Sequence, residues 1–383
     1  MGSQVDLPED ILHQIHSLLP IRDAARTACV SHSFLRSWRS FPHLIMSIAS
    51  LGIKESASSD DLPNRVDHIM QNHSGMGVKT LIINTYPCSN LDPSYVDRWL
   101  QVAITPGIKE FALSFKRVCL KIPCLLEKLD ILIVIGCKTL EVIDSNAPNL
   151  STFFFAGRPM HISLGDASQL TNASIIRNHW PDALYYASTK LPFIAPNLQT
   201  LVLSTSDETV KTPIASGKFL KLKSLEIIVS SPNFSPDYDF CSLVSFVDAS
   251  PALESLIVRI VAPTIRRDSI IEDSSGYSHP GCLQERCHYN LKNVMITGFC
   301  SAKSMIELTI QIIEKTKALK CLTLDTTRGH DRRFVKIDRC LLLNKEALVE
   351  AEKARIAIQR YVKGRVPSAV NLEVIEPCSK CIL

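Results

Sequence analysis

Cysteine and histidine side chains are the residues of this chain whose spacing most suggests metal chemistry. Cys378 and Cys381 form a single C-x-x-C pair close to the C-terminus. A structural zinc site has four ligands, and Cys282, Cys287 and His288 are available to complete one, but their spacing does not require it. We therefore predict that the chain binds no metal and that Cys378 and Cys381 are terminal thiols.

Three side chains near the N-terminus are further candidates. His13 and His16 are three residues apart on one expected helix, a spacing that can hold a metal, but without further ligands a partly exposed interface position is favoured. A reactive cysteine needs a stabilised thiolate, so the apolar helix around Cys29 favours packing over catalysis.

Motifs of enzyme active sites are absent from the sequence. It contains no G-x-S-x-G, H-E-x-x-H, Walker A or Rossmann pattern, and Gly217-Lys218 lacks the other residues of a phosphate loop. We therefore predict a protein that is not an enzyme, with no catalytic residues and no cofactor.

Composition is typical of a globular protein. The 383 residues are 46% hydrophobic and 21% charged, with a net charge of +4, which allows two or three domains. Arg266-Arg267 and Arg332-Arg333 are isolated pairs, so we expect no nucleic-acid partner. The apolar stretch at residues 131–135 is too short to span a membrane.

The N-terminus also lacks the pattern of a secretory signal, because Asp6, Glu9 and Asp10 lie where basic and then apolar residues should be. We expect a location in the cytoplasm, the nucleus or both, without a membrane partner, and reduced cysteines.

Three short helices are predicted over the first 47 residues. Apolar residues at helical spacing make a wide stripe on the first helix, namely Ile11, Leu12, Ile15, Leu18 and Leu19. Pro8 suits a first helical turn and Pro20 ends the helix. A small-residue helix follows, and Ser31 is placed to cap a third helix that carries Phe34 and Trp38. So small a unit with so much apolar surface is expected to require a partner.

These helices resemble an F-box. The resemblance is carried by Leu7-Pro8-Glu9-Asp10-Ile11-Leu12, Leu18-Leu19-Pro20, Ala28-Cys29-Val30-Ser31 and Trp38. It implies binding to a Skp-type adaptor, and through it to a cullin and a RING protein. The predicted adaptor-binding residues are Leu7, Pro8, Ile11, Leu12, Ile15, Leu18, Leu19, Val30, Phe34 and Trp38, with Trp38 and the paired leucines as anchors.

From Val78 onward a short apolar pattern recurs at positions 1, 4 and 6 of successive strands. Its eight copies are Val78/Leu81/Ile83, Ile108/Phe111/Leu113, Leu150/Phe153/Phe155, Leu198/Leu201/Leu203, Leu222/Leu225/Ile227, Leu253/Leu256/Val258, Leu291/Val294/Ile296 and Leu319/Leu322/Leu324. A weaker copy lies near Leu170 and Ile175. This recurrence favours an irregular leucine-rich-repeat solenoid over an α/β domain with unrelated core strands.

A strand–helix–strand unit is predicted within residues 284–326. Ser301 is placed to cap its helix, whose apolar face is formed by Met305, Leu308 and Ile312. Its residues, among them Leu291-Lys292 to Gly298-Phe299 and Ala318 to Leu322, are similar to the FBD segment of plant F-box proteins. A C-terminal helix is expected at 344–362, with Glu350 on its surface.

The predicted fold is α/β: a three-helix F-box, then a solenoid with a curved parallel sheet. The expected segments are 1–47 (F-box), 48–77 (connector with a short helix), 78–283 (leucine-rich repeats), 284–326 (FBD-like) and 327–383 (C-terminal helical cap and tail).

Strand alternation predicts an exposed strip on the concave sheet, because residues beside the core positions point the other way. The predicted substrate-binding residues are Thr200, Val202, Ser204, Ser224, Glu226, Ile228, Ser255, Ile257, Arg259, Met295, Thr323 and Asp325, with Asn293 and Thr297 beside Met295. The resemblance implies the substrate receptor of a Skp–cullin–F-box ubiquitin ligase with an unknown protein substrate. The alternative is an adaptor-binding scaffold or ligand receptor without a degraded substrate.

Overall fold

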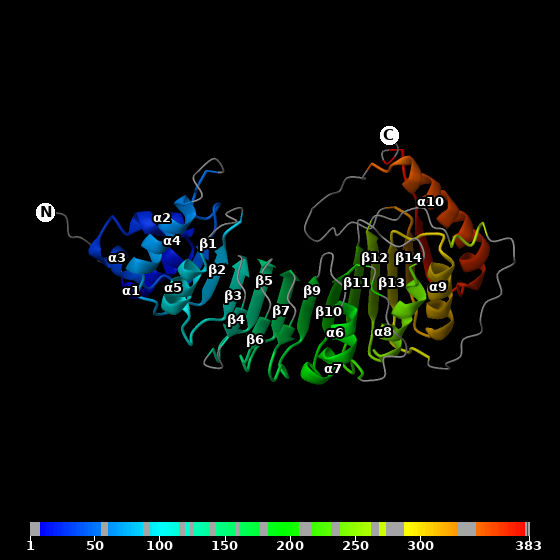
Figure 1. Cartoon of the computed structure of the whole chain (residues 1–383), viewed down its shortest axis with the longest axis horizontal. Coiled ribbons are helices and arrows are strands. Elements are labelled where there is room, and N and C mark those ends of the chain that lie inside the picture. The colour runs from blue at the N-terminus through cyan, green and yellow to red at the C-terminus, as the bar shows by residue number, and fades with distance from the viewer. Residues whose placement is uncertain are drawn as a thin grey trace. The chain divides into compact units, whose positions relative to one another are not determined.

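The computed structural model describes residues 8–54, 60–86, 92–114, 119–122, 126–137, 142–157, 161–176, 183–206, 208, 217–230, 238–261, 268–272, 287–327, 342–379 and 381. The chain divides into two compact units, Met1–Leu170 and Thr171–Leu383. Figure 1 shows the helices and strands, coloured in chain order.

Three short helices open the first unit, as predicted: α1 (Glu9–Ser17), α2 (Ile21–Thr27) and α3 (His32–Arg39). Pro8 and Pro20 are the N-cap residues of α1 and α2. Ser31 caps α3, and its Oγ accepts a hydrogen bond from the Phe34 N–H at 3.2 Å. The cap at Ser31 is therefore confirmed, whereas Pro8 precedes the first residue of α1, and Pro20 precedes α2 after α1 has already ended at Ser17.

A parallel sheet follows the helices directly. Its strands in the first unit are β1 (His43–Met46), β2 (Thr80–Asn84), β3 (Glu110–Ser114), β5 (Ile131–Cys137) and β7 (Thr152–Gly157), paired in that order. Helices α4 (Asp61–Asn72) and α5 (Pro93–Ala103) connect the first strands. A smaller parallel sheet contains β4 (Cys119–Ile122), β6 (Val142–Ser145) and β8 (His161–Ser163).

The second unit repeats the parallel arrangement with helices between strands. Its strands pair in the order β9 (Asn172–Ile176), β10 (Thr200–Thr205), β11 (Ser224–Ser230), β12 (Ser255–Val261), β13 (Asn293–Thr297), β14 (Cys321–Asp325) and β15 (Asn371–Ile375). The helices are α6 (Ala183–Thr189), α7 (Leu191–Ile194), η1 (Phe240–Leu243), α8 (Val244–Asp248), α9 (Lys303–Lys315), α10 (Lys345–Ala357), η2 (Ile358–Val362) and η3 (Lys363–Arg365).

One backbone motif fixes the register of successive repeats. The N–H groups of Lys223 and Ser224 both donate to the Gln199 carbonyl, at 2.8 and 3.0 Å. Glu254 and Ser255 donate to the Lys223 carbonyl in the same way. Because this pair of hydrogen bonds recurs at the same place in successive repeats, the apolar residues at positions 1, 4 and 6 of neighbouring strands lie side by side. All residues of the eight predicted copies are buried, which confirms the repeat pattern.

Additional repeats lie outside those eight copies. Strand β1 carries Leu44 and Met46 in register with Leu81 and Ile83 of β2, and all four side chains are buried. The weak copy near Leu170 forms β9. Strands β5 and β15 also continue the sheets. The repeats therefore begin within the segment expected to be F-box, and the segment expected to be a helical cap contains a strand.

The unit β13–α9–β14 confirms the predicted strand–helix–strand order, and its two strands pair in parallel. The predicted cap is wrong, because Ala302 is the N-cap residue of α9. The Ser301 N–H and hydroxyl instead donate to Glu350 Oε1, both at 2.7 Å. Glu350, expected on the surface of the last helix, is therefore buried.

Among the residues that the structure describes, no helix combines the length and apolar character needed to cross a membrane.

Candidate functional site

The predicted adaptor-binding residues fall into three groups by exposure. Leu7 lies outside the described residues. Pro8, Ile11, Leu18 and Val30 are exposed, with Leu18 and Val30 exposed by 80% and 73%. Ile15, Leu19 and Phe34 are half-buried, whereas Leu12 and Trp38 are buried. Apolar side chains of α1 and of the turn before α3 are thus available to a partner, whereas the other helix residues form the interior.

Trp38 is part of that interior. Its indole is 6% exposed and lies 5.5 Å, centroid to centroid, from the Phe41 ring. Phe41 is itself buried and immediately precedes the chain's entry into β1. Trp38 therefore joins the helices to the first repeat, and its expected role as an anchor on the partner surface does not fit its position.

His16 connects the three helices from inside. Its Nδ1 lies 2.7 Å from Ser37 Oγ of α3, and its Nε2 lies 2.6 Å from Thr27 Oγ1 of α2. The ring is fully buried and packs edge-on against Phe34 at 5.4 Å. Burial, with a smaller contribution from His13, lowers the pKa of His16 below its usual value. The predicted interface position of His16 is therefore wrong.

His73 forms a second buried contact between the helices and the repeats. Its Nδ1 accepts a hydrogen bond from the Gly75 N–H at 2.9 Å, so its Nε2 carries the proton and donates to the Phe41 carbonyl at 3.0 Å. Burial lowers the pKa of His73, although the bond to Phe41 opposes this shift. A neutral imidazole therefore fixes the end of α4 against the chain segment that leads into β1.

Sheet register arranges the predicted substrate-binding residues in rows, here called the strip. One row is Thr200, Ser224, Ser255 and Asn293. The second is Val202, Glu226, Ile257, Met295 and Thr323. The third is Ser204, Ile228, Arg259, Thr297 and Asp325.

The strip is less exposed than alternation predicts. Ser204, Glu226, Ile228, Thr323 and Asp325 are buried. Thr200, Val202, Ser224, Ser255, Ile257, Arg259 and Met295 are half-buried. The prediction of exposure is wrong for the first group, because alternation indicates which face a side chain occupies and not what covers that face.

An ion pair lies at the centre of the strip. Arg259 Nε lies 2.7 Å from Glu226 Oε1, and the two side chains are 11% and 9% exposed. In the next strand, the Thr297 hydroxyl oxygen is buried and has no hydrogen-bond partner among the described residues. The strip thus combines a desolvated charge pair with half-buried apolar side chains, a composition that suits contact with a protein.

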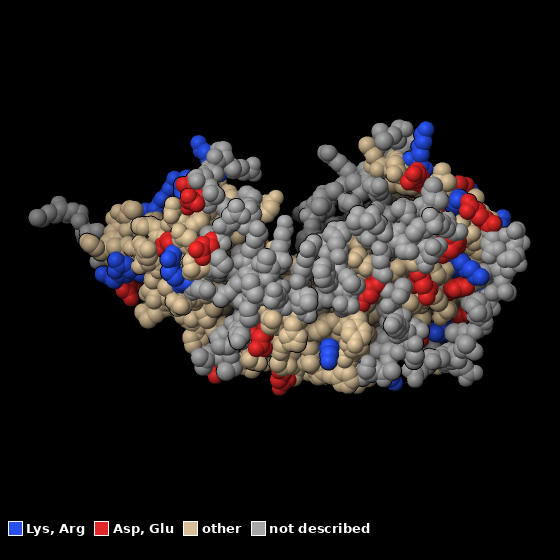
Figure 2. All heavy atoms as spheres, viewed as in Figure 1, with Lys and Arg blue, Asp and Glu red and all other residues tan. Residues whose placement is uncertain are grey.

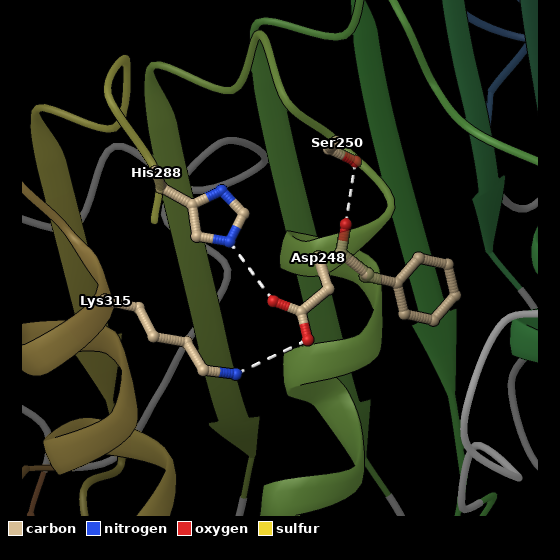
Figure 3. A network of polar contacts seen from close by, with 5 residues as sticks. Asp248, Ser250, His288 and Lys315 are labelled. Carbon is tan, nitrogen blue, oxygen red and sulfur yellow. Dashed lines mark hydrogen bonds and ion pairs between the residues drawn. The ribbon is translucent and has the colours of Figure 1, made fainter. Parts of the chain in front are cut away.

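Figure 3 shows a second polar network, in which Asp248 of α8 meets His288 and Lys315. The Asp248 carboxylate lies 3.2 Å from His288 Nε2 and 3.5 Å from Lys315 Nζ. Burial opposes ionisation, but these two partners hold the pKa of Asp248 below its usual value. The network joins the end of α8 to the end of α9, which is a role in packing.

A pocket of ≈ 360 Å³ adjoins this network, and Lys218, Asp248, Cys287 and His288 contribute to its lining. Cys282, the other residue considered for a zinc site, lies outside the described residues. Within the described part of the chain, no three His, Cys, Asp or Glu side chains are grouped to hold a metal ion.

Figure 2 shows acidic and basic side chains interspersed on the described surface of the face in view.

The combination of an N-terminal three-helix body with parallel strands at leucine-rich-repeat spacing defines an F-box/leucine-rich-repeat protein. Family models agree: the F-box domain matches residues 5–45, and the At1g61320/AtMIF1 LRR domain matches residues 69–118 and 116–379. The chain belongs to the At1g61320/AtMIF1 leucine-rich-repeat family and carries an F-box. No curated protein matches it.

Proposed function

We propose that the chain is the substrate-recognition subunit of a Skp–cullin–F-box ubiquitin ligase. In this function the F-box binds a Skp-type adaptor and the strip binds a protein substrate, while catalysis belongs to a recruited conjugating enzyme. F-box and leucine-rich-repeat modules are typically non-catalytic interaction modules. The FBD resemblance of residues 284–326 stays a prediction, since the matching family model there is a leucine-rich-repeat domain.

The observation that carries the proposal is the exposure of Leu18 and Val30 within the F-box match. These side chains are 80% and 73% exposed, and both belong to the F-box motif of the sequence. F-box domains generally bind Skp-type adaptors. Burying two such aliphatic side chains against an apolar partner is favourable by about 1.5–3 kcal/mol each when burial is complete.

Co-expression of the full chain with a Skp-type adaptor tests this step. We expect a soluble complex that survives size-exclusion chromatography. The double variant Leu18→Ala/Val30→Ala should weaken adaptor binding roughly 10–100-fold, because each truncation removes apolar area that the adaptor would bury. Both substitutions leave the interior unchanged, so thermal stability without adaptor should stay the same.

Met76→Ala is the matched control, because Met76 is 71% exposed in the same unit but lies outside the F-box match. This variant should bind adaptor as the natural chain does. Failure of the natural chain to form a complex, or equal binding by the double variant, would contradict the proposal.

Substrate recognition is assigned to the half-buried apolar side chains of the strip. Val202, Ile257 and Met295 lie in one row on adjacent or nearby strands, next to the Glu226–Arg259 ion pair. A protein segment lying across the strands would contact all three side chains. Holding the substrate near a charged conjugating enzyme raises its effective concentration, which is the contribution expected of a receptor.

Proximity labelling with and without proteasome inhibition identifies candidate substrates. A degraded substrate should accumulate around the natural chain when the proteasome is inhibited, and this increase should be lost with Leu18→Ala/Val30→Ala. Its ubiquitination should then fall with Ile257→Ala/Met295→Ala but not with Leu220→Ala, a 64% exposed residue outside the strip. Labelled proteins whose amounts do not change when the proteasome is inhibited would favour the scaffold or ligand-receptor alternative.

A further inference from the structure

The cysteines of the C-x-x-C pair lie together in a turn that follows β15. The sulfur atoms of Cys378 and Cys381 are 3.7 Å apart. The Cys381 N–H donates to the Cys378 carbonyl at 2.9 Å, which closes the turn. Such a turn keeps its first and last Cα atoms within about 7 Å, close to the range over which two cysteines can form a disulfide.

The two thiols have different surroundings. Cys378 is exposed, whereas Cys381 is 4% exposed and packs with Leu343 and Ala347 at the start of α10. The Cys381 carbonyl also accepts a hydrogen bond from the Leu343 N–H at 2.9 Å. One sulfur is therefore accessible to a reagent in solution, and the other is held beside it by the core.

Metal binding explains this pair less well than redox chemistry does. A structural zinc site requires four ligands, and in the described ranges no third ligating side chain joins the two cysteines. Formation of a disulfide requires only two sulfurs and a two-electron oxidant. We propose that Cys378 and Cys381 form a thiol–disulfide modification site whose oxidant is a small-molecule disulfide of the glutathione type.

The reaction proceeds by two exchanges. The Cys378 thiolate attacks one sulfur of the glutathione disulfide, forms a mixed disulfide and releases one glutathione thiolate. The Cys381 thiol then loses its proton and attacks the Cys378 sulfur, which expels the second glutathione. Two cysteine thiols are oxidised and one glutathione disulfide is reduced to two thiols, which take up the two protons.

Peptide mapping of the full chain at graded ratios of reduced to oxidised glutathione tests the proposal. After acid quenching and alkylation, trypsin cleaves at Arg365 and Lys380, so the disulfide appears as peptide 366–380 linked to peptide 381–383. Because the fold holds the sulfurs together, half oxidation of the native chain should need roughly tenfold less oxidant than in concentrated urea. That factor corresponds to about 30 mV for a two-electron couple.

Single variants separate the two sulfurs. With Cys381→Ser, Cys378 should accumulate as the mixed disulfide, and with Cys378→Ser, Cys381 should stay reduced because it is buried. Cys29, exposed in the first unit, serves as an internal reference for ordinary mixed-disulfide formation. Equal oxidant requirements in native buffer and urea, or mixed disulfide without linked peptides in the native chain, would overturn the proposal.

Discussion

The F-box helices and the strip differ in which kinds of side chain they expose to solvent. At α1 and the turn before α3, the aliphatic Leu18 and Val30 face solvent. On the strip, the charged Glu226 and Arg259 are withdrawn from solvent and paired with each other. The first surface leaves apolar side chains exposed to solvent, whereas on the second the two charged side chains are paired with each other.

Because of this difference, we expect the two surfaces to bind partners through different kinds of contact. Apolar area supplies affinity for a constant partner such as an adaptor. A charge pair that is already formed contributes little to a new contact, so the proposed substrate would bind mainly through the half-buried row of Val202, Ile257 and Met295. We therefore expect the adaptor contact to be tight and the substrate contact to depend on shape.

The largest expected effect is on the repeat core. Phe153 is fully buried at position 4 of its repeat, so Phe153→Ala should lower the free energy of unfolding by about 3–5 kcal/mol through lost burial and a cavity. Leu18→Ala, on the exposed surface, should change it by less than about 0.5 kcal/mol. Urea denaturation of both variants measures the contrast, and similar losses would contradict the assignment of Leu18 to a partner surface.

The next effect concerns the buried ion pair. Arg259→Met removes the guanidinium that lies 2.7 Å from the buried Glu226 carboxylate, and we expect a loss of about 3 kcal/mol in the free energy of unfolding. The double variant Glu226→Gln/Arg259→Met should recover more than half of that loss, because no uncompensated charge remains. Urea denaturation measures both, and a double variant as unstable as Arg259→Met would show that the pair is not coupled.

Much of the fold could be predicted from the sequence because its signals are local and periodic. Positions 1, 4 and 6 alternate inward on a strand, so the copies around Leu201 and Leu225 specify both element and face. The pattern does not predict strand β15, because Ala369 stands three residues before Leu372, where the other copies have a larger apolar residue. It does not predict strand β1 either, because the residues of β1 lie within the F-box segment.

Less of the candidate site could be predicted, because exposure depends on the rest of the chain. Apolar residues form a wide stripe on α1, so their spacing alone does not predict that Leu12 is buried and Ile11 exposed. His16 carries no sequence signal of burial, since its partners Thr27 and Ser37 are brought to it by helix packing. Arg259 and Glu226 are 33 residues apart in the sequence, so their pairing likewise depends on the register of strands β11 and β12.

A smaller effect is expected at the cap of α3. The Ser31 hydroxyl satisfies the Phe34 N–H at the helix N-terminus, so Ser31→Ala should cost about 1 kcal/mol in the free energy of unfolding. Adaptor affinity in the proposed complex should change little, because this bond is made within the chain. Ser33→Ala, inside the same helix, is the control; if it costs as much as Ser31→Ala in urea denaturation, the capping role is wrong.

The smallest effect at neutral pH comes from two buried imidazoles, those of His16 and His73. The pKa values of His16 and His73 are lowered from 6.5 in the folded chain. The unfolded chain therefore binds more protons below about pH 6.5, and stability should fall as the pH decreases through and below that value. Protonated His73 would also lose its acceptor for the Gly75 N–H. Urea midpoints between pH 8 and roughly pH 5 should decline less steeply for His16→Gln and His73→Gln than for the natural chain. Parallel slopes for all three proteins would show that neither imidazole links protonation to folding.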